Sequence, residues 1–322
     1  MSPERTLESN PLEALAGRRA LVVASSGGHL NQAVKWMDRL QLDAASLVVT
    51  FDLPQSRALL AHRSVMYVGY VRSRDWRAVL SVARELWRLV PARRPEVIVT
   101  TGAALALSVW PVARRLGLRI HYIESVSRFA GPSLTGRIMR RLAGVDTWSQ
   151  HDYAQPGWQR VPSLLGLYTV EDVPGASRTE RPLRILVTLG TIRPYRFDRL
   201  IDEVLTSLRD GDEVTWQVGC TTRTDLPGRV VEAISDDEMH RLLEGADVVI
   251  AHGGVGTALD ALARGKTPVM FARRALDGEH VDDHQEQIVG HLSDLGLAER
   301  GDGRLDRATL LAVTTRRVVE TR

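Results

Sequence analysis

Cysteine, aromatic residues and long apolar runs are scarce in this chain of 322 residues. Its one cysteine, Cys220, excludes an internal disulfide framework and fits a reducing compartment. No segment approaches the roughly 18 uninterrupted apolar residues of a membrane-spanning helix, and the best candidate, residues 103–113, is short and contains Pro111. Residues 1–19 are polar and lack the apolar core of a signal peptide. We therefore expect a cytoplasmic protein that spans no membrane.

Aromatic residues make up 5% of the chain, and neither a stacking platform nor a known nucleic-acid-binding motif is evident. Nucleic acid is therefore not an expected partner. Hydrophobic residues at 44% and charged residues at 25% are typical of a soluble globular protein. The length favours two domains, each able to bury its own core.

Charge is divided unevenly along the chain. Residues 1–165 contain 22 Lys and Arg against 12 Asp and Glu, whereas residues 166–322 contain 20 against 27. The most basic stretch, residues 63–141, holds 15 arginines and four acidic residues. A one-sided basic domain indicates an anionic partner, and with nucleic acid set aside we expect an anionic membrane surface.

Short apolar runs alternate with amphipathic segments, a pattern typical of parallel sheets with crossover helices. We predict an α/β protein with two Rossmann-like, doubly wound domains facing a cleft: residues 1–165 and 183–322, with a linker over residues 166–182. Ligands of such sheets bind at the carboxyl ends of the strands. The predicted strands are residues 20–24, 47–51, 65–68, 97–100, 120–124 and 145–148, then 184–188, 214–218, 248–251 and 269–271.

The first motif, SSGGHL at residues 25–30, stands between a predicted strand and a predicted helix. Its glycines permit a tight turn and a close backbone approach to a ligand, and the helix N-terminus favours an anion. His29 would stand at the mouth of the cleft, where an imidazole can take a proton or contact a phosphate. The alternative is an ordinary turn with a surface histidine.

The second motif, YIES at residues 122–125, ends a predicted strand and is followed by Arg128. Glu124 is expected to point into the cleft, as a second candidate base. Alternatively, Glu124 pairs with Arg128 and only fixes the loop, and both can hold at once.

Two further motifs, VTLGT at residues 187–191 and ADVVIAHGGVGT at residues 246–257, repeat the strand–turn–helix design in the second domain. Backbone amides of the first could hold a diphosphate oxygen. The second is no Walker loop, and Leu259 replaces the third glycine of a dinucleotide fingerprint. It suits a diphosphate at a helix N-terminus, with Asp260 one turn on and able to reach a ribose hydroxyl.

The last motif, GEHVDDHQ at residues 278–285, gathers histidines and carboxylates at the start of a predicted helix. Zinc sites prefer better-separated ligands on fixed elements, so we expect no metal there. Polar groups such as Asp283 and Gln285 suit sugar hydroxyls better.

At these motifs the chain resembles the glycosyltransferases of family 28. Residues 20–150 are similar to the membrane-recruited, acceptor-binding subunit of the two-part UDP-GlcNAc transferase that extends dolichyl-diphosphate-GlcNAc, and residues 184–297 are similar to its catalytic, donor-binding subunit. Bacterial exopolysaccharide glycosyltransferases, including those of the glucuronosyltransferase type, resemble both halves. The resemblance implies a GT-B fold, a UDP-sugar donor bound mainly by the second half, inversion at the anomeric carbon, and no cofactor or essential metal.

We also expect departures from the eukaryotic pattern: no counterpart of the N-terminal anchor of the membrane subunit is expected, and Arg273 and Arg274 stand before the last motif. Arginines can grip a carboxylate through two hydrogen bonds. The donated sugar could therefore be GlcNAc, another hexose or a uronic acid.

Motifs and resemblance together assign the site residues, with His29 as the first choice of base and Glu124 as the second. Helix N-termini in the second domain would stabilise the leaving diphosphate. A lipid-linked or polysaccharide-precursor acceptor would be bound by Ser26, Gly27, Gly28, Ser125 and Arg128. The UDP-sugar would be bound by Gly190, Thr191, His252, Gly253, Gly254, Gly256, Thr257, Asp260, Asp283 and Gln285.

Residues 76–90 form the clearest amphipathic helix, with an apolar stripe beside Arg77, Arg84 and Arg88. Such a stripe either packs into the core with a solvated basic edge or rests on anionic lipid. A lipid-linked acceptor favours the second. We expect a peripheral protein at the inner face of the cell membrane, with a membrane-protein partner as a further route of recruitment.

Two other functions remain open: a UDP-sugar 2-epimerase of GT-B-like fold and a non-catalytic subunit that recruits a partner to the membrane. The basic first domain and the YIES motif argue against an epimerase. A recruiting subunit would need only the first domain, whereas here a donor-type domain is attached.

Overall fold

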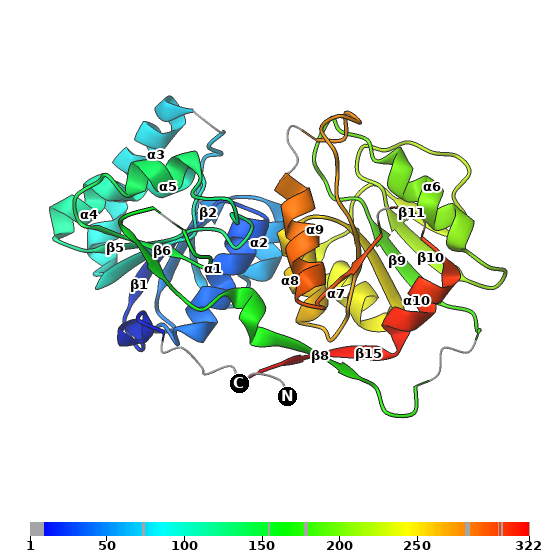
Figure 1. The fold of residues 1–322 in the computed structure, drawn as a ribbon. Helices are drawn as coiled ribbons and strands as arrows, with labels where there is room; N and C mark the ends of the chain where they lie inside the picture. Colours follow the sequence, from blue (N-terminus) through cyan, green and yellow to red (C-terminus); the bar gives the residue numbers. More distant parts are fainter. Residues whose placement is uncertain are drawn as a thin grey trace. The chain divides into compact units, whose positions relative to one another are not determined.

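The computed structural model describes residues 10–72, 75–153, 155–176, 180–280, 284–301, 303 and 305–321. The chain forms two compact units, Met1–Leu164 and Leu165–Arg322. Each is built on a parallel sheet with helices on its faces (Figure 1).

Unit 1 contains a seven-stranded sheet in the order β3-β2-β1-β4-β5-β6-β7, and every neighbouring pair is parallel. The strands are rich in valine and isoleucine, which suit a sheet buried on both faces. They are β1 (Ala20–Val23), β2 (Leu47–Phe51), β3 (Ser64–Val68), β4 (Val97–Thr100), β5 (Ile120–Ile123), β6 (Val145–Ser149) and β7 (Trp158–Arg160).

Helices cover both faces of this sheet (Figure 1). One core cluster joins alternate strand residues such as Leu21 and Val49 to Val79, Leu86 and Val112 of the helices on that face. On the opposite face, α1 buries Leu30, Ala33, Trp36 and Met37. The helices are α1 (Gly28–Arg39), α2 (Pro54–Leu59), α3 (Trp76–Leu89), α4 (Trp110–Leu116) and α5 (Leu134–Met139), with 3₁₀ turns η1 (Glu13–Leu15), η2 (Val90–Arg93) and η3 (Ala104–Val109).

Two side-chain caps fix where helices of unit 1 begin. The carboxylate of Asp75 accepts a hydrogen bond from the amide of Ala78 at 3.0 Å and starts α3. The hydroxyl of Ser133 accepts one from the amide of Gly136 at 3.0 Å and starts α5. Each cap satisfies an amide that the first helical turn leaves without a partner.

Unit 2 contains a six-stranded parallel sheet in the order β11-β10-β9-β12-β13-β14. Its strands are β9 (Arg184–Thr188), β10 (Glu213–Gln217), β11 (Arg229–Val231), β12 (Val248–His252), β13 (Val269–Phe271) and β14 (Glu299–Arg300). One core cluster packs α6 (Asp198–Ser207) and α10 (Arg307–Thr314) on one face, and another packs α7 (Asp236–Gly245) and α8 (Val255–Leu262) on the other. The helix α9 (His284–Asp294) precedes β14.

A short antiparallel sheet closes unit 2. After η4 (Leu164–Leu167), strand β8 (Tyr168–Asp172) pairs with β15 (Arg316–Glu320), so that Val170 lies opposite Val318. Residues 166–182 were expected to form an irregular linker, but this stretch contains β8. β8 is short and mixes charged with β-branched residues, so the sequence shows no clear alternation of polar and apolar residues there.

The predicted α/β class and both parallel sheets are confirmed, with strand ends displaced by a residue at most. The short strands β7, β11 and β14 were not predicted, and neither were β8 and β15. Among the described residues, no helix is long and apolar enough to cross a membrane.

Candidate active site

In each parallel sheet the strand order reverses beside the strand that comes first in that sheet's sequence. β1 lies between β2 and β4, and β9 lies between β10 and β12. At such a switch point the loops after the two adjacent strands diverge and leave a crevice in which ligands of open α/β sheets bind. Each crevice is flanked by motif residues: the SSGGHL turn follows β1, while VTLGT and the glycine-rich turn follow β9 and β12.

His29 lies in the first turn of α1 and reaches across the crevice of unit 1. Its Nδ1 is 2.8 Å from the carbonyl oxygen of Thr101, which follows β4, and the Thr101 hydroxyl donates to the carbonyl oxygen of His29 at 2.8 Å. A carbonyl oxygen only accepts, so Nδ1 carries a proton and the neutral ring keeps its lone pair on Nε2. Burial lowers the pKa of His29 below its usual 6.5. The ring is therefore a neutral proton acceptor at pH 7.

Gly102 makes room for this ring. Its φ is +111°, and an added Cβ would lie 3.2 Å from Cε1 of His29 and 3.1 Å from the hydroxyl oxygen of Tyr122. The next residue, Ala103, also has a positive φ of 59°. The backbone angle at Gly102 thus favours glycine, and a side chain there would crowd both His29 and Tyr122.

Glu124 is buried rather than directed into an open site, with 1% of its surface exposed. One carboxylate oxygen accepts from the amide and hydroxyl of Ser133, at 2.9 and 3.0 Å. The other accepts from the Tyr122 hydroxyl and the Ser125 amide, both at 3.2 Å. The expectation that Glu124 points into the cleft is wrong. Its carboxylate joins the end of β5 to the cap of α5, which is the loop-fixing role, with Ser133 in the place considered for Arg128.

The other predicted acceptor residues divide into lining and supporting positions. Ser26 and Arg128 line a cavity of unit 1. Gly27, with a φ of +67°, is the N-cap of α1, and Gly28 is its first residue. Ser125 is buried, where its hydroxyl accepts from Nε2 of Gln32 at 3.0 Å.

Gln32 is a supporting residue that sequence reasoning missed. Its Nε2 also donates to the carbonyl oxygen of Gly28 at 3.1 Å, and its Oε1 accepts from the amide of Val126 at 2.9 Å. It thereby joins α1 to the loop after β5. A glutamine inside an amphipathic helix gives no sequence signal of such a role.

The cavity of unit 1 has a volume of about 430 Å³, and both polar and apolar side chains line it. Its polar lining comprises Ser25, Ser26, His29, Asp75, Arg128, Ser133 and Thr135. Its apolar lining comprises Phe51, Tyr70, Val71, Trp76, Val79, Ala103, Ala104, Leu107, Leu134 and Ile138. This mixed lining fits an amphiphilic molecule.

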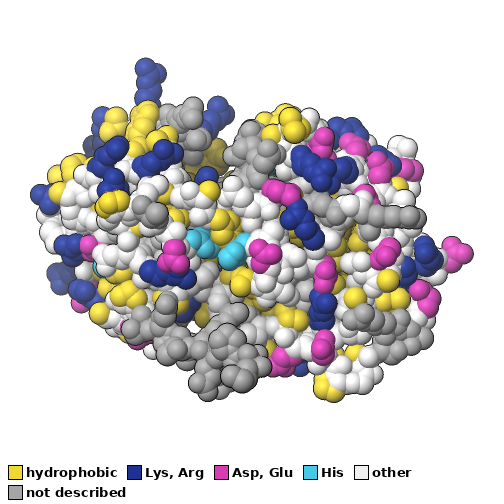
Figure 2. All heavy atoms as spheres, viewed as in Figure 1, with side chains coloured by type: hydrophobic (Ala, Val, Ile, Leu, Met, Phe, Trp, Pro, Cys, Tyr) yellow, Lys and Arg dark blue, Asp and Glu magenta, His cyan; other side chains and the backbone are white. Residues whose placement is uncertain are grey.

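An exposed apolar and basic surface adjoins this cavity. Tyr70, Trp76 and Leu80 are 62%, 52% and 54% exposed, and Trp87 is 41% exposed. Arg77, Arg84 and Arg88 of α3 are exposed among them. Figure 2 shows hydrophobic and Lys/Arg side chains intermingled over the part of unit 1 that contains α3 and α5. We call these seven residues the α3 surface.

The apolar stripe of α3 divides into residues that pack into the core and residues that are exposed. Val79, Ala83, Leu86 and Val90 are buried, whereas Trp76, Leu80 and Trp87 are exposed. Both the packing role and an exposed apolar face are therefore present on the same helix.

In unit 2, the turn after β9 is fixed by Gln217 of β10. The Gln217 side chain accepts from the amide of Gly190 at 3.1 Å and donates to its carbonyl oxygen at 3.0 Å. The amide of Gly190, expected to hold a diphosphate oxygen, is thus bonded within the protein. Thr191 is exposed at the tip of this turn.

His252 ends β12 and packs between two glycines. An added Cβ would lie 2.7 Å from its Nε2 at Gly190 and 2.4 Å from it at Gly254. Burial, and after it the positive charge of Arg273, lowers the pKa of His252 to about 4. The ring is neutral at pH 7, and its Nδ1 lies 3.4 Å from the carbonyl oxygen of Thr188.

The glycine-rich turn leads into α8, for which Gly254 is the N-cap. Gly253 is buried, and an added Cβ there would lie 2.9 Å from Cβ of Gln285. Gly256 and Thr257 fall in the first turn, where amides lack partners within the helix and favour an anion. A diphosphate at this turn remains a prediction that the geometry accommodates.

Asp260 lies on α8 near the acidic first turn of α7. Burial, and after it the charge of Asp260, raises the pKa of Asp236 to about 6. A ribose hydroxyl as the partner of Asp260 stays a prediction.

Gln285 is buried at the start of α9, and its Oε1 accepts from the amide of Arg273 at 3.2 Å. Asp283 lies outside the described residues. Within the part of the chain that is described, no three His, Cys, Asp or Glu side chains are placed to hold a metal ion.

Arg273 is not available to grip a sugar carboxylate. Its side chain is 1% exposed, and its guanidinium donates to backbone carbonyl oxygens of Leu189, Tyr195, Arg196 and Glu279. Of the two arginines considered for a uronic acid, Arg273 is therefore excluded, whereas Arg274 is half-exposed beside Asp277.

Comparison with solved structures defines the class of fold. The chain is similar to MurG of Acinetobacter baumannii, at 18% identity over 92% of this chain and 89% of that one, with a TM-score of 0.53. It is similar to the glycosyltransferase SnogD of Streptomyces nogalater, at 19% identity over 92% and 91%, with a TM-score of 0.52. A spinosyn rhamnosyltransferase, SpnG, complexed with thymidine diphosphate, shares 17% identity over 92% and 91%, with a TM-score of 0.53. The chain has the GT-B glycosyltransferase fold.

A family model matches part of the sequence. Residues 184–313, most of unit 2, match the glycosyltransferase family 28 C-terminal domain. Unit 2 therefore carries the domain expected of the donor-binding half, and the two findings support a GT-B glycosyltransferase of the family 28 type. By sequence, no curated protein matches this chain.

Proposed function

We propose that the protein transfers a sugar from a UDP-sugar to a lipid-linked acceptor at the cytoplasmic face of a membrane, with inversion at the anomeric carbon. The observation that carries the proposal is the cavity of unit 1, whose lining combines the neutral His29 and Arg128 with many apolar side chains. The family 28 domain of unit 2 would bind the nucleotide-sugar donor.

In this proposal the acceptor's apolar portion lies along the wall formed by residues such as Leu107 and Ile138, and its polar group lies by His29 and Arg128. Arg128 provides a positive charge for an acceptor phosphate. Nε2 of His29 takes the proton of the acceptor hydroxyl while the oxygen of that hydroxyl attacks the anomeric carbon. The bond from that carbon to the diphosphate oxygen breaks, and its electron pair leaves with UDP.

The leaving diphosphate needs stabilisation because it gains negative charge as the bond breaks. The first turn of α8 presents the amides of Gly256 and Thr257 at the switch point of unit 2. Gln285 and Asp283 are proposed to contact the sugar, and Asp260 the ribose. No metal ion or other cofactor is proposed.

The α3 surface supports recruitment to anionic lipid. Tryptophan and tyrosine favour the membrane interface, and arginines near it attract acidic headgroups. An acceptor embedded in a membrane would then enter the cavity beside Tyr70 and Trp76, which belong to both the cavity lining and the exposed surface.

Transfer can be tested with purified protein, a membrane lipid extract, and UDP-GlcNAc, UDP-glucose and UDP-glucuronic acid in parallel. A thymidine-diphosphate sugar is included because one structure of similar fold holds thymidine diphosphate. Nucleoside diphosphate release that needs the extract, with labelled sugar in the organic phase, would support transfer. Diphosphate release without acceptor, accompanied by a changed sugar, would indicate an epimerase instead.

A matched pair of variants tests the cavity. Ala104→Leu adds bulk to its apolar wall and is expected to raise the KM for the lipid acceptor while leaving UDP affinity unchanged. Ala143→Leu, at an exposed position outside the cavity lining, serves as the control. Equal acceptor KM values in both variants would remove this cavity from the acceptor site.

A further inference from the structure

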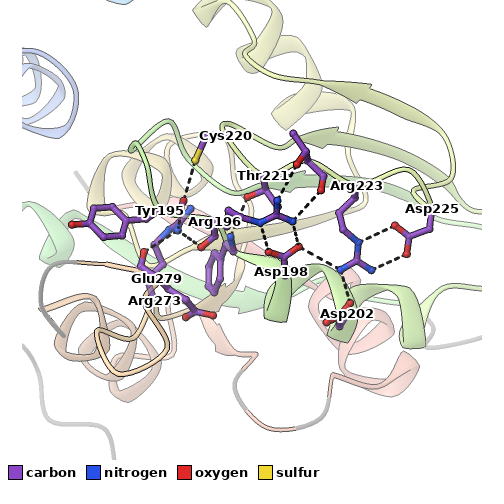
Figure 3. A network of polar contacts seen from close by, with 12 residues as sticks. Tyr195, Arg196, Asp198, Asp202, Cys220, Thr221, Arg223, Asp225, Arg273 and Glu279 are labelled. Carbon is purple, nitrogen blue, oxygen red and sulfur yellow. Dashed lines mark hydrogen bonds and ion pairs between the residues drawn. The ribbon is translucent and has the colours of Figure 1, made fainter.

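The buried side chain of Arg273 holds the loop after β9 by donating hydrogen bonds to backbone carbonyl groups of that loop. Nη1 of Arg273 donates to the carbonyl oxygens of Tyr195 and Arg196, each at 3.1 Å, and to that of Glu279 at 3.0 Å (Figure 3). Nη2 donates to the carbonyl oxygen of Leu189 at 2.6 Å. Three of these carbonyls belong to residues 189–196, the segment that contains the Gly190-Thr191 turn. The fourth ties this segment to the stretch before α9.

The planar shape of the guanidinium is used as well as its charge. Its carbon lies 4.5 Å from the ring centroid of Phe197, a fully buried residue whose amide donates to the Thr221 hydroxyl at 3.0 Å. A planar fork that stacks on a ring and reaches four acceptors is a property of arginine that lysine lacks.

Among the described residues, Arg273 forms no salt bridge with a carboxylate. Glu279, 5% exposed, directs its carboxylate to Arg199, at 2.9 and 3.2 Å, and to the amide of Arg274 at 3.0 Å. Arg199 also lies 3.9 Å from the carboxylate of Asp277. By contrast, the neighbouring Arg223 is surrounded by Asp198, Asp202 and Asp225 (Figure 3). A buried charge is costly unless it is paired or hydrogen-bonded, and Arg273 depends on backbone carbonyls for its hydrogen bonds.

The charge of Arg273 lies close to the switch point of unit 2. It contributes to the lowered pKa of His252, whose ring packs against Gly190 and Gly254. An anion bound at those turns would meet a fixed positive potential in a setting where water screens little.

We propose that Arg273 is a positioning residue of the donor site, which sets the shape of residues 189–196 and supplies a fixed positive potential for a nucleoside diphosphate without contacting it. This inference rests on the proposed function of unit 2. It assigns part of the positive charge near the diphosphate to a side chain that contacts backbone carbonyls and the ring of Phe197.

Calorimetry with UDP and with uridine separates charge from shape. Arg273→Met removes the charge at similar length, and Arg273→Lys keeps the charge but loses the fork. UDP affinity is expected to fall roughly tenfold or more in Arg273→Met, equivalent to about 1.4 kcal/mol, and less in Arg273→Lys. Uridine affinity is expected to change little in either.

Glu279→Gln provides a variant with the opposite expected sign. It removes a negative charge from the cluster and keeps an amide oxygen for Arg199. A charge role predicts tighter UDP binding at unchanged uridine affinity, whereas a purely structural role predicts weaker binding of both. Circular dichroism checks folding, and if Arg273→Met does not fold, Arg273→Lys and Glu279→Gln still decide.

The outcomes distinguish the two levels of the proposal. Native protein that binds neither UDP nor thymidine diphosphate would overturn the proposed function. Native protein that binds UDP, with an unchanged UDP-to-uridine affinity ratio in Arg273→Lys and Glu279→Gln, would overturn only the role of Arg273.

Discussion

His29 and Thr101 exchange hydrogen bonds, each donating from its side chain to the other's carbonyl oxygen at 2.8 Å. The exchange joins the turn after β1 to the loop after β4, and it fixes the histidine tautomer through the backbone rather than through a carboxylate. Unit 2 holds its switch-point histidine in a related but looser way, with Nδ1 of His252 at 3.4 Å from the carbonyl oxygen of Thr188. Both switch-point histidines are thus neutral at pH 7, and each directs Nδ1 to a backbone carbonyl oxygen.

His29→Gln is expected to lower kcat by roughly 10²–10⁴-fold, the usual contribution of a general base, with UDP affinity unchanged. In the native protein kcat/KM should fall on acidification only below pH 6.5, because burial lowers the pKa of His29. Steady-state kinetics from pH 5 to 8 would show both effects. An acid limb that persists in His29→Gln would assign that titration to another group.

Gly254→Ala is expected to abolish or strongly weaken UDP binding, because the added Cβ would lie 2.4 Å from Nε2 of His252 and would displace the ring from the turn. Gly245→Ala is the matched control, since its added Cβ meets nothing within 4 Å. Calorimetry with UDP on both folded variants is the measurement. Equal affinities would exclude the turn at Gly254 from the donor site.

The free energy of unfolding is expected to decrease as the pH is lowered from about 6.5 to about 4, because of His252. Its pKa in the folded protein is about 4, against 6.5 for an unperturbed side chain. Within this window the unfolded chain binds a proton that the folded protein does not, so unfolding is favoured as the pH falls. Urea unfolding at pH 7 and pH 5 should show a smaller loss for His252→Asn than for the native protein. An equal loss would assign the acid sensitivity to other groups.

Replacing Arg77, Arg84 and Arg88 with glutamate is expected to strongly weaken binding to acidic vesicles, since each basic residue near an anionic membrane contributes about 1 kcal/mol. A charge-matched control replaces three exposed arginines of unit 2, Arg209, Arg229 and Arg241. Sedimentation with vesicles at low and high salt is the test. If the native protein does not bind, or both triple variants bind alike, recruitment depends on another surface or on a membrane-protein partner.

Arg307→Met is expected to destabilise unit 2 by about 3–5 kcal/mol, the usual cost of leaving one buried charge without its partner. The side chains of Arg307 and Asp212 are 7% and 1% exposed, and Nη1 and Nη2 of Arg307 lie 2.8 and 3.1 Å from the two carboxylate oxygens. Arg229→Met breaks the exposed pair with Glu238 and should cost about 0–1 kcal/mol. Denaturant unfolding compares the two, and similar losses would contradict the burial argument.

Much of the fold could be predicted because its signals are local. The central strands are continuous apolar runs, and those at β1, β9 and β12 end in glycine-containing turns. The edge strands β11 and β14 span three residues and two residues, too few to display a period. Their pairing is decided by neighbours from distant parts of the chain.

The site was less predictable, because the partners of its side chains are tertiary. The SSGGHL motif after β1 indicated His29. The partner of His29 is the backbone carbonyl of Thr101, and a backbone contact of this kind has no sequence signature. Glu124 and Arg273 were both expected to be exposed, since charged residues beside turns usually are. Burial of Glu124 depends on the cap at Ser133, and burial of Arg273 on four carbonyls and the ring of Phe197.

The pairing of β8 with β15 has a consequence for the order in which the protein forms during synthesis. All seven strands of the first sheet have been made by Arg160, so unit 1 can fold while the rest is being translated. Unit 2 cannot complete its structure in the same way, because β8 is made first and its partner β15 only after the entire second sheet. Until then Tyr168–Asp172 is an unpaired edge, the kind of segment on which chaperones act and on which misassembly begins. We expect the nascent chain to depend most on chaperones in this interval.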